Sequence, residues 1–86
     1  MAEYRVTLSA SAERELNALP ARMIARIFPP LELLAVTPRP PGCKKLKGGD
    51  KEWRIRVGEY RIVYIVDDGH RTVDVTRIAH RRDAYR

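Results

Sequence analysis

The sequence is poor in the residues that build disulfide bonds and metal sites, and it has no long apolar run. Its 86 residues include one cysteine and two histidines, Cys43, His70 and His80. One cysteine excludes an internal disulfide bond and a cysteine metal cluster, and two histidines alone do not complete a zinc site. No segment approaches the ~20 apolar residues of a membrane span, and the start MAEYRVTL lacks the basic and apolar stretches of a signal peptide. We therefore expect a single cytoplasmic domain over residues 1–86, with no metal site and no membrane contact.

Positive charge is concentrated in the second half of the chain. The whole sequence has 17 Lys and Arg against 11 Asp and Glu, which gives a net charge of +6. Residues 1–38 hold four bases and four acids, whereas residues 39–86 hold 13 bases and 7 acids. This asymmetry favours a polyanionic partner, either a nucleic acid or an acidic protein. The alternative is a basic surface that only meets water and salt.

The hydrophobic pattern predicts an α+β fold with the element order β-α-α-β-β-β. Alternating apolar residues at positions 4–8 are typical of a strand, and Ser9 or Ser11 can cap a helix after it. A second helical stripe runs through Pro29 and Pro30, which predicts one kinked helix or two short ones. We expect both helices to cover one face of an antiparallel sheet. After the stiff connector TPRPPG, strands are expected at 52–57, 60–66 and 71–78.

Two short turns predict how the last three strands pair. Gly58 and Glu59 fit a type II′ hairpin turn, which sets Arg56 directly opposite Arg61. One face of the hairpin then carries apolar side chains, and the other carries arginines, with Arg54 beside this pair.

The second turn signal is Asp68-Gly69, which fits a type I′ turn. It sets Tyr64 opposite Val73, so that Val73 joins the apolar face. Both turns therefore predict the same polar face, and a slip of one residue would mix the two faces.

The cross-strand pair of Arg56 and Arg61 needs an explanation, because like charges in this position are destabilising. One interpretation is an anion site built on rigid strands, since guanidinium groups bind phosphate in a bidentate manner. The alternative is that both side chains point into water, or that Asp74 compensates for their charge.

The C-terminal segment IAHRRDAYR combines several reactive side chains. Histidine is a common acid or base near neutral pH, tyrosine can stack on a nucleobase, and arginine can bind phosphate. If strand alternation continues, His80 lies on the same face as Arg61. The alternative is a solvated basic tail. The residues in question are His80, Arg81, Arg82, Tyr85 and Arg86.

Four stretches follow one another in a distinctive order: PRPPG, KKLKG, WRIRVGEYRIVY and HRRDAYR. Together with the N-terminal strand and the Leu-Pro break between the helices, they resemble the RelE side of the RelE/ParE toxin superfamily along the whole chain. This resemblance implies a microbial-RNase-like toxin that enters the A site of the 70S ribosome and cleaves mRNA there. The nucleophile would be the ribose 2′-OH, without a metal or cofactor.

The resemblance also implies roles for single residues. Arg61 matches the strand arginine that stabilises the charged transition state, and Arg81 matches the tail arginine assigned to the leaving group or phosphate. Tyr85 matches the terminal tyrosine that orients or stacks on the substrate, as in the HRxxY subgroup. Arg54 and Arg56 stand where the prototype of the family has lysines.

These two arginines change the expected chemistry, because arginine does not lose its proton in proteins. Arg54 and Arg56 are therefore expected to bind phosphate, and His80 becomes the best candidate for the acid or base, with Tyr85 second. Arg82 is expected to contact phosphate as well. The loop lysines would either bind ribosomal RNA or remain solvated, and these are Lys44, Lys45 and Lys47.

The implied partners are a cognate acidic RelB-like antitoxin, the ribosome and mRNA, with DNA reached only through the antitoxin. A groove for the antitoxin could involve Leu31, Leu33 or Leu34, although core packing is the commoner use of such residues. Two other functions fit the same fold. One is a ParE-like inhibitor of DNA gyrase, and the other is a non-toxic RNA-binding relative.

Overall fold

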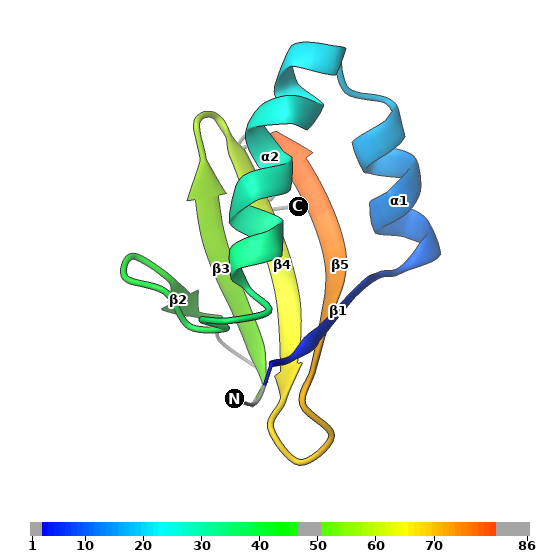
Figure 1. Ribbon diagram of the computed structural model, residues 1–86. Helices are drawn as coiled ribbons and strands as arrows, with labels where there is room; N and C mark the ends of the chain where they lie inside the picture. The colour runs from blue at the N-terminus through cyan, green and yellow to red at the C-terminus, as the bar shows by residue number, and fades with distance from the viewer. Residues whose placement is uncertain (1–2, 47–50, 81–86) are drawn as a thin grey trace.

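Two helices cover one face of a five-stranded sheet in the computed structural model, which describes residues 3–46 and 51–80 (Figure 1). The predicted order β-α-α-β-β-β is confirmed, with one additional two-residue strand before the last three. The elements are β1 (Arg5–Leu8), α1 (Ala10–Asn17), α2 (Ala21–Leu33), β2 (Lys44–Lys45), β3 (Glu52–Val57), β4 (Tyr60–Asp67) and β5 (Thr72–His80).

The strands are arranged in the order β1-β5-β4-β3-β2. Strands β2 to β5 pair in an antiparallel manner, whereas β1 runs parallel to β5, with Leu8 opposite Val75 at its end. The expected antiparallel sheet therefore has one parallel pair at its edge. Among the described residues β1 is the first strand and β5 the last, so this pair joins the beginning and the end of the described part of the chain.

Both helices form where the sequence predicts them. Helix α1 is capped by Ser9, whose Oγ accepts the backbone N–H of Ala12 at 3.1 Å. Helix α2 is a single helix that contains both Pro29 and Pro30. The two prolines remove two backbone donors, but burial of other side chains of the helix, Ile27 and Leu31, offsets this loss. Within residues 3–46 and 51–80, neither helix is long and apolar enough to cross a membrane.

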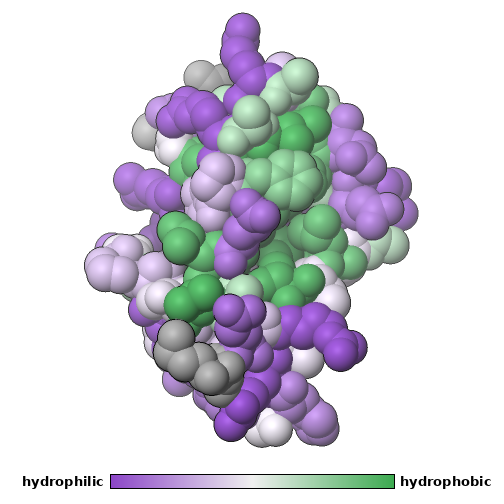
Figure 2. Space-filling model, viewed as in Figure 1, coloured by the Kyte–Doolittle hydropathy of each residue, from purple (hydrophilic) through white to green (hydrophobic). Residues whose placement is uncertain are grey.

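The core lies between the helices and the sheet. Apolar side chains also gather over the middle of the helix-covered side, with hydrophilic ones around them (Figure 2). Of the large apolar side chains in the described part of the chain, three are strongly exposed, Phe28 at 46%, Leu33 at 60% and Val36 at 59%. The buried cluster is formed by Ala12, Leu16, Ile27, Leu31, Leu34, Ile55, Val57, Ile62, Tyr64, Val66, Val73, Val75 and Ile78.

The hairpin between β3 and β4 has the predicted register, with Arg56 opposite Arg61. Gly58 has a φ of +59° and is followed by Glu59 without a positive φ, as a type II′ turn requires. The guanidinium of Arg26 on α2 lies 3.1 Å from where a Cβ of residue 58 would be. Glycine at this position therefore serves both the turn and the close approach of α2.

The predicted register of the next hairpin is wrong by two residues. Asp67 lies opposite Thr72, which leaves a four-residue loop in place of the type I′ turn. The reason is local, since both the backbone N–H and the imidazole of His70 bond to the Asp67 carboxylate, at 3.1 and 3.0 Å. Arg71 then closes the loop with a φ of +54°. Because the shift is even, Val73 is still buried on the predicted face.

A β-bulge in β5 changes the faces of the last residues of the strand. The register shifts between Val63 and Tyr64, so that Thr76 has no partner on β4. Beyond the bulge, Ala79 lies opposite Arg61 and His80 lies opposite Tyr60. The expectation that His80 shares the face of Arg61 is therefore wrong, because one extra residue reverses the alternation of side chains.

Candidate nucleic-acid interface

Four basic side chains come together on the sheet face that the helices leave open. Strand pairing sets Arg56 opposite Arg61 and Lys44 opposite Arg54. Because side chains alternate along a strand, all four belong to one face of the sheet. We refer to this face as the basic face, defined by Lys44, Arg54, Arg56 and Arg61.

A basic cavity of about 230 Å³ opens on this face. Among the described residues its lining consists of Gly42, Lys44, Arg54 and Arg56, none of which carries a carboxylate. Among the described residues, Nη1 of Arg54 is buried and has no hydrogen-bond partner. A buried charged donor without an acceptor is costly, and an anion in the cavity would supply the acceptor.

Arg61 lies next to this cavity and is almost fully buried, with 6% of its surface exposed. The residue opposite Arg61 on β5 is Ala79, which is also buried. Its small side chain leaves room for the guanidinium of Arg61. Arg56 on the other side is exposed. The pair therefore combines one buried guanidinium and one exposed guanidinium that can move towards a ligand.

The Asp74 carboxylate does not compensate for the arginine pair. It lies opposite Ile65, four residues and thus ~13 Å along β4 from Arg61. Its Oδ1 accepts the hydroxyl hydrogen of Thr7 at 3.2 Å. Compensation by Asp74 is therefore wrong, and the two guanidinium groups remain candidates for binding an anion.

His80 belongs to a different part of the surface. Its ring lies against Tyr60, and it lines a cavity of about 380 Å³ next to α1. This cavity also includes Glu15, Arg77 and Ile78. The structure thus separates the predicted acid or base from the basic face.

The other predicted site residues divide into two groups. Lys45 is exposed and lies opposite Trp53, so alternation sends it away from the basic cavity. Lys47, Arg81, Arg82 and Tyr85 lie outside the residues that the structure describes.

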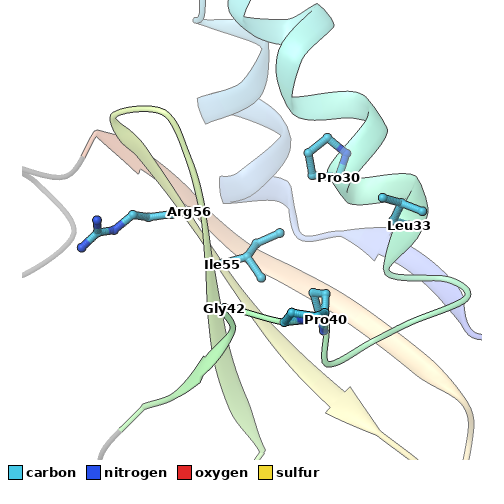
Figure 3. A pocket seen from close by; sticks show the side chains of 7 residues that line it. Pro30, Leu33, Pro40, Gly42, Ile55 and Arg56 are labelled. Carbon is cyan, nitrogen blue, oxygen red and sulfur yellow. The ribbon is translucent and has the colours of Figure 1, made fainter.

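An apolar cavity of about 270 Å³ adjoins the basic one (Figure 3). The sequence predicts an apolar groove on the second helix, but not the part that the connector plays in it. Leu33 and Pro30 of α2 face Pro40 of the connector and Ile55 of β3 across it, while the guanidinium of Arg56 points away to the other side of β3. The two cavities share Gly42 and Arg56 in their linings. The signal in the sequence was PRPPG, which is rigid enough to form a wall. Of the three leucines considered for a groove, Leu31 and Leu34 are buried in the core and only Leu33 lines this cavity.

Hydrogen bonds fix the connector that forms this wall. Arg39 binds the Asp68 carboxylate with two nitrogens, at 3.2 and 2.7 Å, and lies 5.2 Å over the ring of Trp53. The Tyr4 hydroxyl donates to the same carboxylate at 2.6 Å. The hydrogen bond from Arg39, and after it the one from Tyr4, holds the pKa of Asp68 below its usual value.

A second hydrogen bond to the connector comes from Tyr64, which is buried and donates its hydroxyl to the Pro38 carbonyl at 2.9 Å. Burial raises the pKa of Tyr64.

Among residues 3–46 and 51–80, no group of three or more His, Cys, Asp or Glu side chains could hold a metal ion. The described side chains of the basic cavity are all hydrogen-bond donors, so the geometry fits an oxyanion such as phosphate.

Comparison with known proteins identifies the family. Residues 6–85 match the family described as "ParE toxin of type II toxin-antitoxin system, parDE". "Toxin RelE" of Mycobacterium tuberculosis is 36% identical, with 96% of this chain and 87% of that protein covered, and "Toxin RelG" of the same organism is 34% identical, with 96% and 97% covered. In the solved complex of archaeal RelE and RelB from Pyrococcus horikoshii OT3, one chain matches with a TM-score of 0.82 and 26% identity, over 98% of this chain and 100% of that one. The chain therefore belongs to the RelE/ParE superfamily of type II toxin–antitoxin toxins, as a RelE-like member.

Proposed function

We propose that this toxin cleaves mRNA in the ribosomal A site by attack of a ribose 2′-oxygen on the adjacent phosphate. The basic cavity carries this proposal, because its described side chains are those of Lys44, Arg54 and Arg56 and it adjoins the buried Arg61. Similarity to RelE and RelG toxins supports it further. Cationic side chains such as these would bind the phosphate and not the base, so positioning by the ribosome would choose the site of cleavage.

The step breaks one P–O bond and forms another. The 2′-oxygen bonds to phosphorus, its proton leaves, and the 5′-oxygen of the next nucleotide departs with a proton. The product ends in a 2′,3′-cyclic phosphate. Negative charge grows on the phosphate oxygens in the transition state, and Arg56 and Arg61 would stabilise that charge from fixed strands.

Proton transfer is not assigned to the basic face, because arginines do not titrate in the working range. We propose that acceleration comes mostly from electrostatic stabilisation and from alignment of the 2′-oxygen on the ribosome. From the resemblance, Arg81 would assist the leaving group and Tyr85 would orient the substrate. His80 faces Tyr60, so we propose that it supports this end of the sheet instead of exchanging protons with RNA.

The lysines would bind ribosomal RNA. Lys44 and Lys45 are both exposed on the two-residue strand β2, at the edge of the sheet. Lys47 would extend the same contact. Contacts to phosphate from such side chains add affinity without sequence preference.

The antitoxin would use the apolar cavity. The solved archaeal relative is described as a complex of RelE with RelB, and here Leu33 is 60% exposed beside the cavity that shares Arg56 with the basic one. We propose that an apolar side chain of an acidic antitoxin enters this cavity while its carboxylates cover Arg54 and Arg56. Binding of mRNA and binding of the antitoxin would then exclude one another. The toxin–antitoxin complex would contact DNA through the antitoxin.

The test is to map mRNA 5′ ends after induction of the wild-type toxin and of Arg61→Ala, Arg56→Ala and the double variant. Each single variant should lower cleavage by about 10²- to 10³-fold. In a separate experiment, a 2′-deoxy nucleotide at the scissile position of an mRNA supplied to ribosomes should stop cleavage by the wild-type toxin. Arg22→Ala, an exposed arginine of α2, is the matched control and should cleave normally. Persistent cleavage by the folded double variant would contradict the proposal, and DNA breaks with intact mRNA would indicate a gyrase inhibitor.

A further inference from the structure

The outer edge of β5 changes its partner halfway along the strand. Its first half pairs with β1, which ends at Leu8 opposite Val75, and the N–H of Ser9 still donates to the Val75 carbonyl at 2.9 Å. Beyond this point the chain turns into α1, so β1 no longer covers the edge of β5. An unpaired strand edge next to a helix needs other partners for its backbone groups.

Side chains at the start and middle of α1 supply these partners. The hydroxyl of Ser9 donates to the Thr76 carbonyl at 3.4 Å. One carboxylate oxygen of Glu15 accepts the backbone N–H of Ile78 at 2.8 Å, and the other lies 3.6 Å from Nε of Arg77. Glu15 therefore takes the place that a residue of β1 would have if that strand continued.

These contacts hold the bulge of β5. The unpaired residue is Thr76, whose own hydroxyl donates to the Val63 carbonyl at 3.3 Å. The backbone N–H that Glu15 accepts belongs to Ile78, two residues further on. In the register after the bulge, the N–H of Ile78 points to the outer edge of β5, where Glu15 lies. Without the extra residue it would point towards β4, because neighbouring residues of a strand direct their backbone groups to opposite edges.

The register after the bulge decides what stands next to Arg61. With the bulge, Ala79 lies opposite Arg61 and Ile78 is buried in the core. Without it, continuation of the earlier pairing would set Ile78 opposite Arg61 on the basic face and would turn Arg77 towards the core. The branched side chain would then crowd the buried guanidinium.

We propose that Glu15 is a positioning residue for the basic face: through its hydrogen bond to Ile78 it holds the register of β5 that keeps Ala79 beside Arg61. This inference rests on the proposed mRNA cleavage for its effect on activity. Glu15 does not contact the basic face itself and acts only through the backbone of β5.

Two conservative variants separate the effect of the length of the Glu15 side chain from the effect of its charge. Glu15→Gln keeps the length and an oxygen acceptor but loses the charge, whereas Glu15→Asp keeps the charge but is too short to reach the N–H of Ile78. If the hydrogen bond matters, Glu15→Gln stays within about twofold of the wild-type cleavage rate, and Glu15→Asp and Glu15→Ala fall by about tenfold. Arg77→Ala keeps the acceptor and should resemble Glu15→Gln. Glu13→Ala, an exposed acid of the same helix, is the matched control.

The measurement is single-turnover cleavage of ribosome-bound mRNA over a range of ribosome concentrations, with amide hydrogen exchange of Ile78 in the free toxin. Glu15→Asp should lower the rate at saturation, leave the half-saturating concentration unchanged and speed exchange at Ile78 by about tenfold. A wild-type rate for Glu15→Asp, or an equal loss in Glu15→Gln, would overturn the proposal.

A toxin that does not cleave mRNA can still be used to test the role of Glu15. If the wild-type toxin does not cleave mRNA on ribosomes, the exchange of Ile78 and the nuclear Overhauser contact between His80 and Tyr60 still report on the register. Both should persist in Glu15→Gln and be lost or weakened in Glu15→Asp. Unchanged exchange and an unchanged ring contact in Glu15→Asp would overturn the role of Glu15 whatever the toxin cuts.

Discussion

The ring of His80 stands almost perpendicular to the ring of Tyr60, with centroids 5.4 Å apart and an angle of 83° between the planes. This edge-to-face geometry is favourable for aromatic rings. It exists because the bulge at Thr76 moves His80 to the face opposite the basic cavity. The residue that the sequence nominates as acid or base is thereby committed to a packing contact.

A first prediction concerns the catalytic weight of His80. His80→Ala should lower mRNA cleavage by less than about tenfold, whereas loss of a general acid or base costs about 10²- to 10⁴-fold. Single-turnover cleavage on ribosomes, compared with Arg61→Ala, measures both effects. A loss of the larger size in a folded His80→Ala protein would restore His80 to the reaction.

A second prediction concerns the electrostatic contribution of Lys44. Lys44→Ala should weaken binding of a single-stranded RNA that carries a 2′-deoxy nucleotide at the scissile position. The slope of log affinity against log salt should become shallower by about 0.7, because one fewer phosphate is neutralised. Fluorescence anisotropy at several salt concentrations gives the slope. Arg22→Ala, on the helical side, should keep the wild-type slope.

A third prediction separates the apolar cavity from catalysis. Leu33→Asp introduces a charge at a side chain that is 60% exposed, so the fold should be retained. An acidic antitoxin should bind this variant at least about tenfold more weakly, since a carboxylate replaces the apolar contact and repels acidic neighbours. Isothermal titration with the cognate antitoxin measures this change. Cleavage of mRNA by the free variant should equal that of the wild type, and reduced cleavage would argue against separate roles.

A fourth prediction concerns acid stability. The pKa of Asp68 is lowered by Arg39 and Tyr4, so the carboxylate stabilises the fold above the unfolded-state pKa of about 4, and this contribution is lost as the pH falls through the lower folded-state value. Asp68→Asn should therefore be less stable than the wild type at pH 7, and the two should converge in acid. Urea unfolding between pH 7 and pH 2 provides the curves. Parallel curves would contradict the role of this ion pair, and Glu32→Gln, an exposed acid of α2, is the control.

The sequence by itself determined the parts of the fold that depend on neighbouring residues. Gly58 and Glu59 were enough for the register of β3 and β4, because a two-residue turn leaves a single pairing, and that pairing sets Arg56 opposite Arg61. The three arginines of the basic face were therefore predictable from alternation, whereas Lys44 joins them only through its pairing with Arg54. The resemblance added the family, which the comparisons confirm.

Only the tertiary structure decided where the last strand lies and what its end presents. The loop after Asp67 followed hydrogen bonds to His70, a local arrangement that competes with the expected type I′ turn. The bulged end of β5, by contrast, contacts Ser9 and Glu15, more than sixty residues away along the chain. Contacts of this second kind carry no local signal, since the sequence around Ser9 and Glu15 indicates only a helix and its cap. The position of His80, the parallel pairing of β1 with β5, and the apolar cavity beside Arg56 all arise from packing between distant segments.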